Sequence, residues 1–387
     1  MNERIIFVTH GALGIIDADA RRVEPRRLDF DVPDAHVWGH GPVFSDGSRI
    51  VLISFDDPRT WEGRARSRAW IFDLDRPGDP IDALTEIATN NPPSSFMPVA
   101  ALLPCETRMV ANPMVDGRQC LVTMNLDGTD CEWITQPEDG VAYGASLSPD
   151  GERIAWHAAT ESGYRVYVAD IDGANRVQMP AEPGHLYFGP TWSPDAEWIA
   201  YLDCDAANDP GHDRADIVVA APDGSEQFTA VWGGRHWMSA TWGSADTRGN
   251  GSNVPRWSPA ENTLIYSRLS ESARWPWIYQ PDRPDTDHFN RDFVPEQASG
   301  GTDLCAFNQD IGSTAPLTQS SSRDMWDFRA EWSPDGSRIA FCRALVGRPS
   351  ELWVMDADGR NQRALTLGLD YRGTDHPRWI PGRGTHI

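Results

Sequence analysis

The feature that most constrains the fold is a short corner motif, Trp-Ser-Pro-Asp, which returns along the chain with an apolar strand after it. Its clearest copy lies in residues 331–366, EWSPDGSRIAFCRALVGRPSELWVMDADGRNQRALT. Asp-Gly between alternating apolar runs is the strongest short-range signal for a β-hairpin, because glycine accepts the positive φ that the turn requires. This segment therefore predicts a four-stranded antiparallel meander of the size of one propeller blade.

The corner motif recurs at intervals that suit repeated blades. Further copies begin at Leu147, Trp192 and Trp257, looser copies begin at Phe44 and Trp379, and a degenerate unit begins at Val99. The count predicts an all-β fold, a seven-bladed β-propeller of four-stranded antiparallel blades. A pair of open β-sandwiches, the alternative all-β fold, fits this period poorly.

The two ends of the chain predict how such a ring closes. Only one strand follows His376, while residues 1–28 contain the apolar runs of three more strands. We therefore expect residues 1–28 and 376–387 to form one blade, closed by strands from both termini, with no free sheet edge. Residues 1–387 then make a single domain, in which an insertion at 268–302 lies over one rim.

Charge and cysteine content exclude several classes of partner. Lys and Arg number 34 against 57 Asp and Glu, which gives a formal net charge of −23. Such an excess of acid repels nucleic acid and anionic membranes. The six cysteines have no C-x-x-C spacing, so a zinc thiolate site is not expected. Neither a signal peptide nor a membrane span is visible, and we expect a cytoplasmic protein; the oligomeric state stays open.

Candidate site residues gather in the loops that lead into the first strand of each predicted blade. His185, His236 and His376 lie there, and Arg329 has in its own blade the position that His376 has in the last. His288 lies in a very polar part of the insertion. Histidines that share one rim suit proton transfer near neutral pH.

Arginine and aromatic side chains accompany these histidines. The expected contacts to substrate are Arg235, Arg248, Asn253, Arg291, Arg329, Arg372 and Trp237. Guanidinium groups bind carboxylates in a bidentate manner, and aromatic rings can stack on sugars, so the set favours an acidic carbohydrate. The alternative is structural, with the tryptophans packing the insertion and the arginines pairing with nearby aspartates. No P-loop or dinucleotide motif is present, so no nucleotide cofactor is expected.

The repeat, x-W-S-P-D-G-x-x-I-A-F followed by L-W-V-M-D-A-D-G, resembles the β-propeller repeats of the TolB-like group, which includes the oligogalacturonate lyase-like enzymes. In those lyases histidines hold a divalent metal and another histidine removes a proton. Of their paired His-Pro-His, only His376 is matched, in Asp375-His376-Pro377. Arg329 stands where the lyases have a metal-binding histidine, and Asn253-Val254 stands in place of the catalytic histidine.

The resemblance implies a carbohydrate lyase that cleaves a uronate-containing oligosaccharide by β-elimination. His236 is the expected base, and Tyr187 or His288 the expected acid. A divalent metal, Mn, Ca or Zn, held by His185, His376 and Asp375 is one alternative, and a metal-free site of His, Tyr and Arg is the other. The rival function is a non-catalytic binding or adaptor propeller of TolB-like type.

Overall fold

The computed structural model describes most of the chain in terms of β-strands. The described residues are 3–9, 12–30, 36–55, 67–76, 78–87, 94–208, 213–242, 249–274, 277–279, 291–293, 297–345, 348–366 and 373–382. The helices among them are short 3₁₀ turns such as Pro80–Ala83, and none could cross a membrane. The fold class is all-β, as predicted.

The chain divides into two compact units. The first unit comprises Met1–Leu28, Asn208–Ile217 and Thr229–Ile387, and the second comprises Asp29–Ala207 and Val218–Phe228. Strands β19 (Arg214–Ala220) and β20 (Gln227–Trp237) contribute residues to both units. The chain therefore passes between the two units several times.

The second unit is built from antiparallel meanders. Its strands are β4 (His36–Val43), β5 (Arg49–Phe55), β6 (Ser67–Asp73), β7 (Leu84–Ile87), β8 (Ser94–Leu102), β9 (Arg108–Val115), β10 (Arg118–Gln119), β11 (Val122–Asn125), β12 (Glu132–Trp133), β13 (Val141–Leu147), β14 (Arg153–Thr160), β15 (Gly163–Asp170), β16 (Val177–Gln178), β17 (His185–Trp192) and β18 (Ile199–Asp205). They pair in the orders β4-β5-β6-β7, β8-β9-β11-β12 and β13-β14-β15-β16, and β17 pairs with β18.

The first unit repeats the same pattern. Its remaining strands are β1 (Arg4–Thr9), β2 (Ala12–Asp17), β3 (Arg26–Leu28), β21 (Ser239–Trp242), β22 (Gly249–Ser252), β23 (Arg256–Trp257), β24 (Thr263–Leu269), β25 (Trp277–Tyr279), β26 (Arg291–Phe293), β27 (Thr302–Asn308), β28 (Ser313–Pro316), β29 (Met325–Trp332), β30 (Arg338–Leu345), β31 (Glu351–Asp356), β32 (Arg363–Ala364) and β33 (Asp375–Ile380). The order β29-β30-β31-β32 is the meander expected from residues 331–366.

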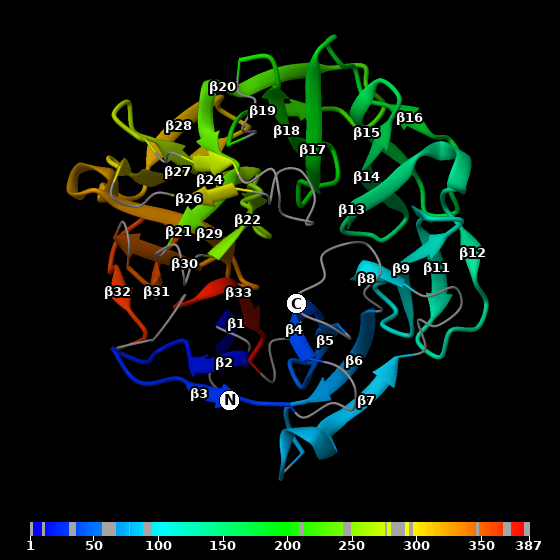
Figure 1. The fold of residues 1–387 in the computed structure, drawn as a ribbon, viewed down its shortest axis with the longest axis horizontal. Coiled ribbons are helices and arrows are strands. Elements are labelled where there is room, and N and C mark those ends of the chain that lie inside the picture. The colour runs from blue at the N-terminus through cyan, green and yellow to red at the C-terminus, as the bar shows by residue number, and fades with distance from the viewer. Residues whose placement is uncertain are drawn as a thin grey trace. The chain divides into compact units, whose positions relative to one another are not determined.

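Strands from both ends of the chain lie in one sheet of the first unit. β33 pairs antiparallel with β1, and the sheet continues through β2 to β3 (Figure 1). Within the predicted insertion 268–302, β25 pairs with β26, whereas most of its tip, residues 280–290, lies outside the described residues.

Each residue type of the corner motif has a defined role. The Ser333 hydroxyl donates to Asp335 Oδ1 at 2.6 Å and accepts from the Arg338 N–H at 2.9 Å, which fixes the hairpin. The Trp332 indole N–H donates to the Arg256 carbonyl at 3.1 Å, on strand β23. The corner therefore closes its own hairpin and also ties β29 to β23, the first strand of the preceding meander.

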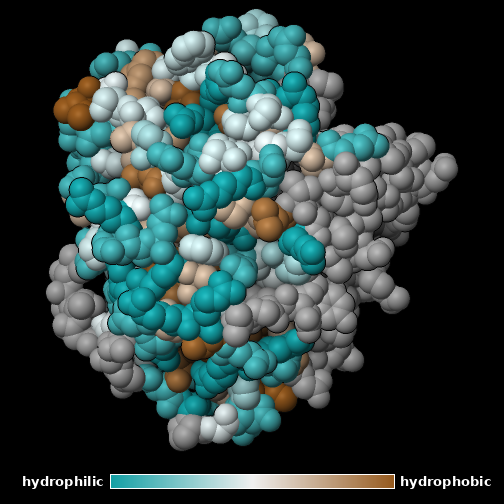
Figure 2. Space-filling view, turned by 90° about the vertical axis from the view of Figure 1, so that its left-hand side faces the viewer, coloured by the Kyte–Doolittle hydropathy of each residue, from teal (hydrophilic) through white to brown (hydrophobic). Residues whose placement is uncertain are grey.

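The core lies between meanders that pack on one another. In the first unit, Phe341 and Trp332 of the β29–β32 meander share a core cluster with Ile265 of β24 and Leu304 of β27. Alternate residues of each strand point into these layers, as strand geometry requires. Where the face in Figure 2 is drawn in colour, it is mostly hydrophilic with scattered apolar residues, which agrees with the acidic composition.

Candidate functional site

A register shift interrupts the first strand of several sheets, and the residue at the shift has positive φ. In β13 and β17 that residue is glycine, Gly144 with φ 63° and Gly189 with φ 57°. In β29 it is Arg329 with φ 53°, and in β33 it is His376 with φ 46°. Because this backbone conformation strains residues other than glycine, side chains kept there point to function.

Arg329 and His376 converge on one carboxylate, that of Asp375. Arg329 Nε lies 3.0 Å from Asp375 Oδ1, and His376 Nδ1 lies 2.9 Å from Oδ2. The His376 backbone N–H also donates to Oδ1, at 2.8 Å. The side chain of Arg329 is 5% exposed, whereas that of His376 is 42% exposed. The imidazole is thus the part of this triad that a substrate can reach.

The triad holds a neutral imidazole beside an ionised carboxylate. Burial alone would raise the pKa of Asp375, but His376 and Arg329 lower that pKa to about 2. Burial, with help from the cations Arg329 and Arg256, outweighs Asp375 and lowers the pKa of His376. A neutral imidazole that donates from Nδ1 to Asp375 leaves Nε2 as its proton acceptor. His376 can therefore serve as a general base at neutral pH.

Two more arginines flank the triad through Glu331. Glu331 lies 3.3 Å from Arg256 Nε and 3.3 Å from Arg378 Nη1. The side chains of Arg256 and Arg378 are 41% and 36% exposed. When His376 is neutral, the guanidinium groups of Arg256, Arg329 and Arg378 outnumber the carboxylates of Glu331 and Asp375 by one. The cluster therefore carries a positive charge in a chain whose formal net charge is −23. Such a cluster favours an anionic ligand.

Asn253 has a positioning role. Its Oδ1 accepts from the Arg329 backbone N–H at 3.0 Å, and its Nδ2 donates to the Trp237 carbonyl at 2.9 Å. Because Asn253 is 3% exposed, a direct substrate contact, which the sequence predicted, is not supported. The side chain instead holds the strained backbone of Arg329 in place.

His236 and Trp237 are also scaffold residues. His236 is fully buried, its Nε2 lies 2.5 Å from the Asn253 carbonyl, and burial lowers its pKa to about 4. Trp237 is fully buried against Trp326 and Phe328, with ring centroids 4.5 and 5.8 Å away. The predicted base His236 and the predicted substrate platform Trp237 therefore have no surface to offer a substrate.

His185 and Tyr187 belong to the second unit. His185 Nδ1 lies 2.7 Å from Asp203 Oδ1, and this hydrogen bond raises the pKa of His185. Tyr187 is 1% exposed and its hydroxyl accepts from the Glu182 N–H at 2.9 Å. The buried phenol argues against the expected role of Tyr187 as the acid.

Several predicted residues cannot be placed at the triad. His288, Arg248 and Arg372 lie outside the described residues, and Arg291 begins β26 with its side chain outside them. Arg235 lies on β20, 3.4 Å from Glu271. Arg256 and Arg378 were missed as site residues, although each directly precedes the tryptophan of a corner motif, as Glu331 does.

The described residues do not fit a divalent metal at the triad. Both oxygens of Asp375 already bond to Arg329 or His376, and the Arg329 guanidinium is a cation in contact with the carboxylate. Within the described part of the chain, no group of three or more His, Cys, Asp and Glu residues could hold a metal ion.

The structure resembles several solved β-propeller proteins, while no family model matches the sequence. An oligogalacturonate lyase in complex with manganese superposes with a TM-score of 0.55 at 12% identity, over 95% of this chain and 85% of that one. A second oligogalacturonate lyase, from Vibrio parahaemolyticus, superposes with a TM-score of 0.52 at 11% identity, over 95% of this chain and 85% of that one. TolB from Acinetobacter baumannii gives 0.47 at 16% identity, over 88% of this chain and 68% of that one. The chain is therefore structurally similar to the oligogalacturonate lyases, and its fold is of their β-propeller type.

Proposed function

We propose that the protein is a lyase that cleaves a uronate-containing oligosaccharide by β-elimination, with His376 as the base. The observation that carries the proposal is the neutral, Asp375-bound imidazole of His376 beside the exposed guanidinium groups of Arg256 and Arg378. Removal of a proton next to a carboxylate needs these two groups, a base and a cation that stabilises the developing negative charge. The fold shared with oligogalacturonate lyases supports the uronate as substrate.

Substrate binding and proton removal in the proposed reaction are assigned to named residues. Arg256 and Arg378 bind the uronate carboxylates, since they are the more exposed guanidiniums. His376 Nε2 takes the C5 proton, and the electron pair left on C5 forms the C4–C5 double bond as the C4–O bond breaks. The leaving oxygen takes a proton from water. Arg329 and Asp375 hold the imidazole in its neutral, oriented form.

A matched pair of substrates tests this proposal. Trigalacturonate should yield an unsaturated product that absorbs in the ultraviolet, and its neutral galactose counterpart should not. His376→Gln should lose roughly 100- to 10,000-fold in kcat, the usual contribution of a general base. Absence of product from a broad panel of uronate oligosaccharides, with the folded protein, would refute the lyase and favour a binding propeller.

A further inference from the structure

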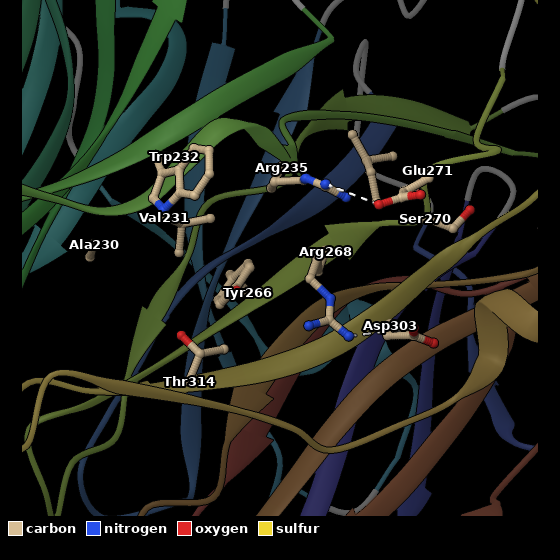
Figure 3. A pocket seen from close by; sticks show the side chains of 11 residues that line it. Ala230, Val231, Trp232, Arg235, Tyr266, Arg268, Ser270, Glu271, Asp303 and Thr314 are labelled. Carbon is tan, nitrogen blue, oxygen red and sulfur yellow. Dashed lines mark hydrogen bonds and ion pairs between the residues drawn. The ribbon is translucent and has the colours of Figure 1, made fainter.

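A groove in the first unit is lined by an exposed tryptophan and two arginines that the triad does not use. It lies between β20 on one side and β24, β27 and β28 on the other (Figure 3), with a volume of about 510 Å³. Its size is that of a small-molecule site. The residues that matter here are Trp232 and Arg235 on one wall and Arg268 on the other.

Trp232 is the aromatic platform of the groove. Its side chain is 76% exposed, whereas tryptophans such as Trp237, Trp326 and Trp379 are at most 4% exposed. A large apolar ring left in water at the edge of a concavity marks a binding surface. Such a flat face suits the apolar face of a pyranose ring.

The backbone next to Trp232 is built to present it. Gly233 and Gly234 both have positive φ, 78° and 62°, which only glycine adopts readily. A Cβ on Gly233 would meet nothing within 4 Å, so the glycine serves the bend and not a tight contact. The Gly234 N–H donates to Asp216 Oδ1 at 2.5 Å and fixes the bend. As a result Trp232 and Arg235 line the same groove.

The two guanidiniums of the groove are loosely paired. Arg235 Nη2 lies 3.4 Å from Glu271, whose side chain is 88% exposed, and Arg268 Nη2 lies 3.9 Å from Asp303. The Asp303 carboxylate also accepts from the Ser321 N–H and hydroxyl, at 2.9 and 2.7 Å. The pair of Arg235 with Glu271 is exposed and the pair of Arg268 with Asp303 is long, so both are weak and a ligand carboxylate in bidentate geometry can replace them.

We propose that this groove is a second binding site, which takes an acidic sugar unit with its ring on Trp232 and its carboxylate on Arg235 and Arg268. The choice of an acidic saccharide rests on the proposed function, whereas the roles of Trp232, Arg235 and Arg268 are inferred from the geometry of the groove alone. The site holds the sugar and performs no chemistry, because its lining includes neither histidine nor an unpaired carboxylate among the described residues.

Site-resolved NMR tests the groove without any need for turnover. The full chain is labelled with 5-fluorotryptophan, and the ¹⁹F resonances of Trp232 and Trp133 are assigned from Trp232→Phe and Trp133→Phe. Trigalacturonate is then titrated, with its fully methyl-esterified form as the uncharged control. Trp133, 38% exposed and in the second unit, is the internal control.

We expect trigalacturonate to shift the Trp232 resonance in a saturable manner and to leave Trp133 unmoved. The ester, and the acid with Arg235→Gln, should bind at least tenfold more weakly. A Trp232 resonance that does not move, or that responds equally to acid and ester, overturns the proposal. Since the readout needs no cleavage, an inactive protein with a responsive Trp232 would refute the lyase alone, and an active protein with a silent Trp232 would refute the groove alone.

Discussion

At the scale of single residues, the backbone of His376 offers a test of its own. Its φ of 46° is a conformation that costs an L residue about 1 kcal/mol and glycine almost nothing. Of two variants that both lack the imidazole, His376→Gly should therefore be more stable than His376→Ala by about 1 kcal/mol in urea unfolding. Equal stabilities would mean that the positive φ is not kept in solution.

The pH dependence of activity follows from the pKa of His376. Because that pKa is lowered from its usual value of 6.5, the neutral base persists below pH 6.5. The acidic limb of kcat/KM should thus lie below pH 6.5, with activity constant from there to neutral pH. Asp375→Asn, which removes the carboxylate, should change both the pH at which kcat/KM falls and the value of kcat. A limb above pH 6.5 would exclude His376 as the base in this environment.

Stability should also fall in acid because of His236. Its pKa is about 4 in the folded chain and 6.5 when unfolded, so between these values the unfolded state binds more protons. The contribution of His236 to the free energy of unfolding is constant above pH 6.5. At pH 5 it is lower by about 2 kcal/mol. His236→Gln should flatten the loss between pH 6.5 and pH 5 in denaturant titrations, and an unchanged slope would contradict the buried neutral imidazole.

At the scale of elements, each corner tryptophan ties the first strand of its own meander to the first strand of the preceding meander. The indoles of Trp192, Trp332 and Trp379 donate to the carbonyls of Ser146, Arg256 and Glu331 at 3.0, 3.1 and 3.0 Å. Trp332→Phe removes the indole donor together with part of the buried ring, which should cost more than the roughly 1 kcal/mol of the hydrogen bond alone. Trp353→Phe, which removes an indole donor bonded to Glu351 two residues away, is the matched control and should cost less. Equal losses of stability in the two variants would show that the indole hydrogen bond of Trp332 does not stabilise the packing of the two strands.

The same elements show what the sequence could and could not predict. The hairpins of residues 331–366 were predicted because Asp-Gly turns and period-two strands are local signals. The roles of His236 and Asn253 were missed, because burial depends on the sheets that pack on them. His376 was predicted as a site residue from its place three residues before a corner tryptophan, whereas the charge balance around Glu331 depends on Arg256 and Arg378, far apart in sequence.

At the scale of the whole molecule, the single β-propeller domain and its seven blades remain a proposal. The chain passes repeatedly between the two units, through β19 and β20 among others. We expect the units to unfold together for this reason, in one transition seen alike by tryptophan fluorescence and circular dichroism. Two separated transitions would show that the units are independent domains.

The central claim, elimination by a base at the triad, is tested most directly by the mass of the products. Trigalacturonate incubated with the protein in H₂¹⁸O should give two fragments whose masses sum to that of the substrate, with one fragment unsaturated, because elimination adds no water. His376→Gln should give neither fragment at a comparable rate. Fragments that together carry one added water containing ¹⁸O would show hydrolysis, and an intact substrate would show that the protein does not cleave it; either result would contradict the lyase.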